Sequence, residues 1–211
     1  MSSRILLIAA LLFTQAALAQ ETPAFNGDAK AGQALAYTCN GCHAIPNYKN
    51  VYPTYSVPKL NGQRPQYLVA ALKAYKSGER SHGTMHSQAA SLSEQDMADV
   101  AAYLAGPTVL VETRNDVPAE KRPKASEVCL ACHGTNGVGI TADYPTLSGQ
   151  HRDYLVRALT DYQRGGRKNA IMAGMASTLT AEDIQALATF YASQKPALSV
   201  VPKKASFLSS K

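Results

Sequence analysis

The sequence has no tryptophan, and only 7% of its 211 residues are aromatic. The core must therefore be filled by small apolar side chains or by a bound group that supplies apolar mass. Beyond residue 19 no apolar run is long enough to span a membrane, and no stretch alternates as a strand would. Because the composition is 45% hydrophobic and 17% charged, we expect a folded chain of one or two domains. The helical spacing described below, without any competing strand pattern, predicts that the chain is all-α.

Acidic residues are outnumbered, since 21 lysines and arginines face 15 aspartates and glutamates. The formal charge is +6, but the basic residues form no stripe, so we expect no nucleic-acid partner. Residues 20–110 hold 7 basic and 6 acidic groups, and residues 111–211 hold 13 and 9. The second half is therefore the more basic, and we expect the molecule to dock to a partner in a salt-dependent way.

Residues 1–19 are predicted to be a secretory signal peptide. Arg4 precedes an apolar run from Ile5 to Phe13, and Ala17-Leu18-Ala19 fits the small-x-small cleavage pattern. A membrane anchor is the alternative, but the run is short for a span. We expect cleavage before Gln20 and export, to the periplasm in a Gram-negative bacterium.

All four cysteines lie in two identical C-x-x-C-H motifs, Cys39–His43 and Cys129–His133. This is the attachment pattern of c-type haem, because two thiols one turn apart can bond the two vinyl groups while the next histidine reaches the iron. Structural disulfides would not need a histidine after each pair, and one zinc site would gather all four cysteines. We predict two covalently bound haem c groups, attached at Cys39, Cys42, Cys129 and Cys132, with His43 and His133 as proximal ligands.

The chain repeats itself. Residues 57–63 and 144–150 share Pro, Leu, Gly and Gln at a spacing of 87, which continues to Asp96 and Asp183. The cysteine motifs are 90 residues apart, so the first copy has three extra residues before Pro58. The repeat predicts a first domain over 20–106, a linker over 107–117, a second domain over 118–195 and an irregular tail over 196–211 with no assigned role.

Each copy is predicted to contain three helices. The first leads into the C-x-x-C-H motif, and the second has apolar or aromatic residues at helical spacing over 67–75 and 154–162. The third begins at Ser93 or Thr180, each an N-cap with aspartate three residues later. Three short helices are a small core, and a covalent haem would complete it.

The sixth iron ligand is expected between the second and third helices. Met85 and Met172 occupy matching positions of the repeat, and this favours them. Met175 is the alternative in the second copy, where packing against haem is its other interpretation. His82 or His86 could instead make the first haem bis-histidine, although both are expected at the surface.

Other polar residues at matching positions are candidates for supporting roles. Pro58 and Pro145 could each accept a hydrogen bond from the proximal histidine, unless they are ordinary loop prolines. Four further residues could hold haem propionates or could simply be solvated at helix ends. They are Tyr75, Tyr162, Arg80 and Arg167.

With these residues assembled, the sequence resembles the class I c-type cytochromes, and specifically the dihaem cytochrome c4 family. The resemblance is carried by tandem C-x-x-C-H motifs, by P-x-L-x-G-Q after each, and by a methionine before L-[ST]-x-x-D in each half. It implies two all-α domains about a pseudo-twofold axis, two nearby haems with propionates at the interface, and His/Met ligation. It also implies a periplasmic protein, soluble or loosely membrane-associated, that carries electrons toward a terminal oxidase.

One loop departs from the family pattern. The second copy has a glycine-rich loop over Gly134–Gly139, whereas the first has Ala44–Asn50 and a longer stretch rich in Tyr and Pro. We therefore expect different redox potentials for the two haems.

These features together predict an electron carrier and no enzyme. Its redox partners would be a quinol-oxidising cytochrome bc complex and a terminal oxidase. A dihaem peroxidase is an alternative, but it would need a haem with an open position. The electron-transfer subunit of a periplasmic dehydrogenase is another.

Overall fold

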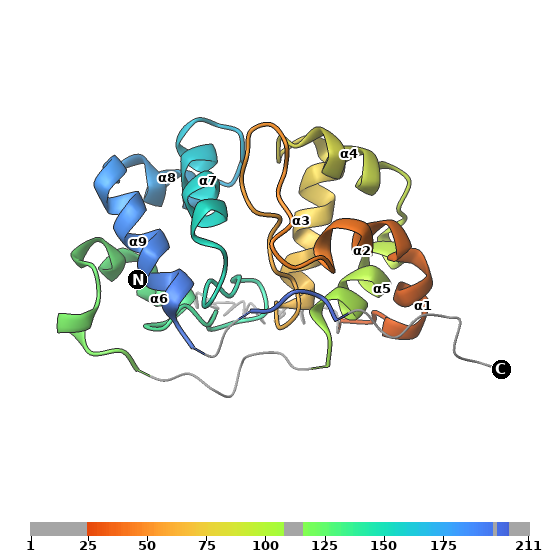
Figure 1. Cartoon of the computed structure of the whole chain (residues 1–211), viewed down its shortest axis with the longest axis horizontal. Coiled ribbons are helices and arrows are strands. Elements are labelled where there is room, and N and C mark those ends of the chain that lie inside the picture. The colour runs from red at the N-terminus through yellow and green to blue at the C-terminus, as the bar shows by residue number, and fades with distance from the viewer. Residues whose placement is uncertain (1–24, 108–115, 196–197, 203–211) are drawn as a thin grey trace, which may run out of the picture.

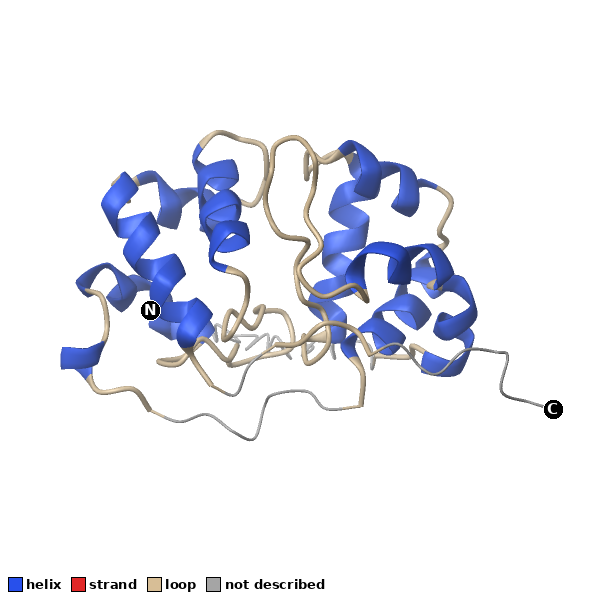
Figure 2. Cartoon of the chain, viewed as in Figure 1, coloured by secondary structure: helices blue, strands red, loops and turns tan. Residues whose placement is uncertain are grey.

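The computed structural model describes residues 25–107, 116–195 and 198–202. In these ranges the regular structure is helical, and strand pairing is limited to isolated bridges (Figure 2). The all-α prediction is confirmed. No helix of the described part of the chain is long and apolar enough to cross a membrane.

The first half, residues 25–107, consists of α-helices joined by loops (Figure 1). Asp28 caps the first helix, and Ser93 with Asp96 forms the predicted capping box at the last. The helices are α1 (Ala29–Leu35), α2 (Tyr37–His43), α3 (Pro65–Ser77), α4 (Gly83–Ala90) and α5 (Glu94–Ala105).

The second half, residues 116–195, repeats this plan with a less regular start. Thr180 and Asp183 form its capping box. Two 3-10 helices replace α1 and most of α2. Its elements are η1 (Ala119–Lys121), η2 (Lys124–Cys129), α6 (Leu130–His133), α7 (Arg152–Gln163), α8 (Ala170–Ser177) and α9 (Ala181–Ser193).

The prediction of three helices per copy was too low, because α4 and α8 form an additional helix in each half. Both are eight residues long, and neither shows a clear helical period, since α4 has one large apolar side chain and α8 is apolar over most of its length. Each begins with a side-chain cap instead. His82 accepts a hydrogen bond from the Met85 N–H, and Asn169 accepts one from the Met172 N–H.

Each half packs its last helix against the helix after the P-x-L-x-G-Q segment. The predicted apolar stripe of α5 is buried, with Met97, Val100 and Leu104 at most 4% exposed. In α9 the stripe is buried in the same way. This packing leaves one side of each helix pair free to line a cavity.

The two halves lie side by side and contact each other through matching segments (Figure 1). Arg80 and Arg167, which are equivalent in the repeat, pair with each other in an antiparallel bridge. Asp153 accepts hydrogen bonds of 2.9 Å from both the amide and the hydroxyl of Ser56. The arrangement agrees with a pseudo-twofold relation between the halves.

The predicted tail is irregular where it is described, but part of it packs on both halves. Residues 198–201 form a strap across both halves, with Leu198 2% and Val201 3% exposed. The Leu198 N–H donates to the Ser148 carbonyl, Ser199 pairs with Asn61, and the Val201 N–H donates to the His43 carbonyl. These partners are far away in sequence, so no local pattern indicated them. The predicted signal peptide and most of the linker lie outside the described residues.

Candidate haem sites

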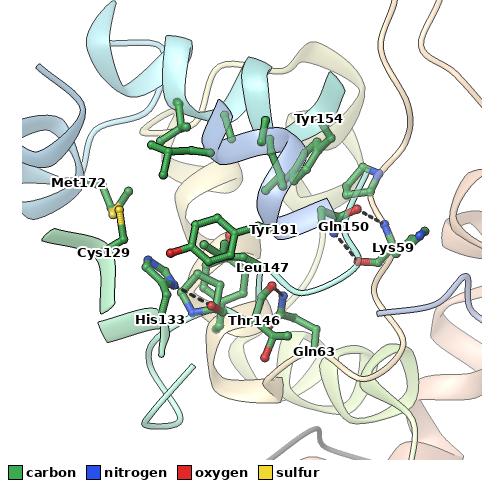
Figure 3. A pocket seen from close by; sticks show the side chains of 18 of the residues that line it. Lys59, Gln63, Cys129, His133, Thr146, Leu147, Gln150, Tyr154, Met172 and Tyr191 are labelled. Atoms are coloured by element: carbon green, nitrogen blue, oxygen red, sulfur yellow. Dashed lines mark hydrogen bonds between the residues drawn. The ribbon is translucent and has the colours of Figure 1, made fainter. Parts of the chain in front are cut away.

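The second half contains a cavity of about 820 Å³, including its open mouth, between α7, α9 and the segment that carries the C-x-x-C-H motif. Cys129, His133 and Met172 contribute to its lining and are labelled in Figure 3. Leu155, Leu187 and other apolar side chains complete the walls. A mostly apolar cavity with a few polar groups and a histidine in its wall is typical of a cofactor site.

The first half contains the equivalent cavity, of about 1110 Å³ including its open mouth. Cys39, Cys42, His43 and Met85 all line it. The loop that is specific to this half adds Asn50 and Tyr55 to its wall, for which the second cavity has no counterpart in its lining.

The four cysteines are free, half-buried thiols. Burial raises the pKa of Cys39 and Cys129, so both are neutral thiols at pH 7. In the described part of the chain, no three His, Cys, Asp or Glu residues gather as a metal cluster would require. Cys39 and Cys42 line the first cavity and Cys129 lines the second, where thioether attachment of a haem would need a thiol.

Each motif histidine is oriented by a proline carbonyl, as the sequence predicted for Pro58 and Pro145. The His43 Nδ1 lies 3.0 Å from the Pro58 oxygen, and the His133 Nδ1 lies 2.9 Å from the Pro145 oxygen. Since a carbonyl only accepts, Nδ1 carries the proton and Nε2 keeps its lone pair for iron. Burial lowers the pKa of both histidines, which favours the neutral form that binds metal.

Candidates for the sixth ligand are separated by their positions. Met85 lines the first cavity and Met172 lines the second. Met175 is 42% exposed and is not among the residues that line the second cavity. His82 lines the first cavity rather than lying at the surface, but both of its nitrogens are engaged. Nδ1 accepts from the Met85 N–H, and Nε2 lies 3.2 Å from the Asn50 Oδ1. His86 is exposed and bonds the Tyr75 carbonyl.

Arg80 and Arg167 are buried between the halves rather than solvated, each 7% exposed. Arg80 donates to the Tyr67 hydroxyl at 2.9 Å, and Arg167 donates to the Tyr154 hydroxyl at 3.1 Å. Tyr75 packs against the Arg80 guanidinium, and Tyr162 packs against that of Arg167.

These two guanidiniums have no carboxylate partner within salt-bridge distance among the described residues. Burial by itself would raise the pKa of Tyr154, but Arg167 and Arg80 together hold it below its ordinary value. Positive charge in a buried site that also lines the cavities suits an anionic group such as a haem propionate. The residues present thus fit haem: cysteines for its attachment, a histidine and a methionine for its iron, and buried arginines for its propionates.

Sequence reasoning missed four residues here. Tyr67 and Tyr154 were assigned to a helix face, yet both line both cavities. Gln63 and Gln150 served only as markers of the repeat, yet each bonds the backbone of the opposite half. Their recurrence at matching positions was the available signal.

Comparison with known proteins gives a consistent result. The profile described as "Cytochrome c" matches residues 29–106, and "Cytochrome C oxidase, cbb3-type, subunit III" matches residues 120–190. Cytochrome c4 of Pseudomonas aeruginosa is 35% identical over 178 residues, covering 78% of this chain and 87% of that protein. A thiosulfate dehydrogenase electron acceptor of Stutzerimonas stutzeri is 31% identical, covering 88% and 91%.

The fold is shared with a solved relative. The crystal structure of reduced recombinant cytochrome c4 from Pseudomonas stutzeri superposes with a TM-score of 0.63 at 30% identity, covering 80% of this chain and all of that one. With two C-x-x-C-H sites in two cytochrome c domains, two covalent haem c groups are implied. The chain therefore belongs to the cytochrome c4 family of dihaem electron-transfer cytochromes.

Proposed function

We propose that the chain carries electrons in the periplasm from a quinol-oxidising cytochrome bc complex toward a terminal oxidase. The observation that carries the proposal is the pair of donors in each cavity, His43 with Met85 and His133 with Met172. A haem held by both donors has no position left for a substrate, and its iron changes oxidation state with little rearrangement. The chain's own part is to attach, orient and shield the haem.

The adjacent cavities support electron exchange within the molecule. Pro58, Leu60, Tyr67 and Tyr154 line both of them, so a single layer of side chains separates the two sites. The extra loop of the first half, with Asn50 and Tyr55 in its cavity wall, supports different potentials for the two haems. Identical midpoints in a redox titration would contradict that difference.

We assign partner docking to the second half. Ile171 and Met175 flank Met172 on α8 and are 61% and 42% exposed, and Val128, before Cys129, is 57% exposed. The matching residues of the first half are polar, namely Thr84, Gln88 and Thr38. Exposed apolar side chains beside a cofactor, in the more basic half, favour a partner with an apolar, acid-rimmed face. Electron transfer to such a protein should slow as salt rises, and a salt-independent rate would contradict the assignment.

A second candidate acceptor role rests on a relative. The 31% identical protein of Stutzerimonas stutzeri is named a thiosulfate dehydrogenase electron acceptor. The chain could likewise accept electrons from a periplasmic dehydrogenase, and co-purification of a larger catalytic subunit would favour this role. A dihaem peroxidase is less well supported, because both cavities present a methionine.

The test of the proposed function is the spectrum of the full-length holoprotein. We expect two haems per chain by pyridine haemochrome, a full-strength band for methionine-to-iron bonding in the oxidised state, and no binding of carbon monoxide. Met172→Ala should halve the band, whereas the matched control Met175→Ala should leave it unchanged. A wild-type protein that binds carbon monoxide readily would overturn the electron-carrier proposal in favour of the peroxidase.

A further inference from the structure

The side-chain amide of Gln63 forms a two-way hydrogen bond with the backbone of the opposite half. Its Nε2 donates to the Thr146 carbonyl at 2.9 Å, and its Oε1 accepts from the Thr146 N–H at 2.8 Å. Oε1 also accepts from the Arg64 N–H at 2.9 Å. The side chain is 3% exposed, so water does not compete for these bonds.

Gln150, the equivalent residue of the second half, makes the equivalent contact in the opposite direction. Its Oε1 accepts from the Lys59 N–H at 3.0 Å, and its Nε2 donates to the Lys59 carbonyl at 2.9 Å, as the dashed lines in Figure 3 show. Oε1 again accepts from the following backbone N–H, that of His151. Gln150 is 4% exposed. We call these two contacts the crossed amide pairs.

The crossed amide pairs reach the residues next to the prolines that orient the proximal histidines. Thr146 follows Pro145, whose carbonyl accepts from His133. Lys59 follows Pro58, whose carbonyl accepts from His43. Gln63 of the first half therefore fixes the loop that holds a histidine of the second half, and Gln150 does the reverse.

We propose that Gln63 and Gln150 are positioning residues that act across the interface, each on the haem of the opposite half. The inference rests on the proposed function, because it takes His43 and His133 as iron ligands. A hydrogen bond from Nδ1–H to a carbonyl makes the imidazole a stronger donor to iron, which favours the oxidised state. Loosening the loop weakens that bond, so the potential of the opposite haem rises.

The experiment uses the full-length holoprotein with Gln63→Leu and Gln150→Leu, which keep bulk and remove both amide groups. The two haems are distinguished with Met85→His and Met172→His variants, since bis-histidine ligation lowers the potential of the haem that carries it. Haem methyl resonances assigned in this way are then followed through a redox titration. Asp153→Asn is the matched control, because it weakens a different contact between the halves.

We expect Gln63→Leu to favour reduction of the second haem about tenfold, a rise of about 59 mV for one electron. The first haem should change much less. Gln150→Leu should give the opposite pattern, and Asp153→Asn should shift neither selectively. Gln63→Glu keeps the acceptor for the Thr146 N–H. The potential of the second haem in this variant should therefore lie between those of Gln63→Leu and the wild type.

Shifts confined to the mutated half, or equal in both haems, would overturn the crossed assignment. A shift of the same size and selectivity in Asp153→Asn would do so too, since it would show a general effect of a looser interface. If the Leu variants do not fold, Gln63→Glu decides the question. A change of potential confined to the second haem would support the crossed assignment, and the absence of such a change would overturn it. Failure of the proposed function would appear differently, as a wild-type protein without the methionine-to-iron band.

Discussion

At the scale of single residues, Asp153 connects the two halves by accepting both an N–H and an O–H from Ser56. Burial by itself would raise the pKa of its carboxyl, but these hydrogen bonds hold it below the ordinary value. A lowered pKa means that the carboxylate stabilises the folded chain above about pH 4, the ordinary value. That stabilisation disappears as the pH falls through the lower, folded-state pKa.

We therefore expect Asp153→Asn to reduce the free energy of unfolding by about 0.5–1 kcal/mol at pH 7, the small size reflecting a partly exposed group. Below the folded-state pKa the variant and the wild type should become equally stable. Denaturant unfolding of both holoproteins across this pH range measures the difference. A stability gap that persists unchanged into strong acid would show that the charge of Asp153 is not the cause.

The residues with covalent or axial chemistry could be proposed from sequence because their spacing is local. C-x-x-C-H places two thiols and an imidazole within five residues, and the repeat selects Met172 over Met175. Tyr154 and Gln63 could not be assigned in this way, because their partners belong to the opposite half. Contacts across a domain interface leave no periodic pattern in either partner.

At the scale of elements, the helices α4 and α8 show how one position can be filled by different side chains. His82 and Asn169 are equivalent in the repeat, and each caps the helix that carries the methionine by accepting its N–H. The cap gives His82 a role in the first cavity that does not require it to bind iron. These helices were missed from sequence because capping, rather than an apolar stripe, defines them.

We expect His82→Asn to preserve the cap of α4 and to leave the methionine-to-iron band at full strength. His82→Ala removes the cap and should cost about 1 kcal/mol of stability. Asn169→Ala is the matched variant in α8 and should cost a similar amount. The band and the thermal midpoint measure both effects; a large change of the spectrum in His82→Asn would instead identify His82 as an iron ligand.

At the scale of the whole molecule, the strap of residues 198–201 connects both halves after the last helix. Leu198 bonds the second half, and Ser199 and Val201 bond the first. Fully burying an aliphatic side chain contributes about 1.5–3 kcal/mol, and Leu198 and Val201 are both buried. The strap is thus a substantial part of the contact between the halves.

A chain that ends at Lys195 should therefore be less stable by about 2–4 kcal/mol than one that ends at Pro202. The second chain keeps the whole strap and controls for removal of the remaining residues. Denaturant unfolding of the two holoproteins gives the comparison. Equal unfolding midpoints would mean that the strap packs on the halves without stabilising them.

The strap also delays the completion of both halves until residues 198–201 have been made. A chain is synthesised from its N-terminus, so residues 198–201 emerge after every helix. Until then the His43 carbonyl lacks the Val201 N–H, and Asn61 lacks Ser199. Both halves are therefore completed only when the strap has been made, since Leu198 bonds the second half and Val201 bonds the first. Cys39 and Cys42 thus lie in a half whose last backbone partners arrive after all of the described helices.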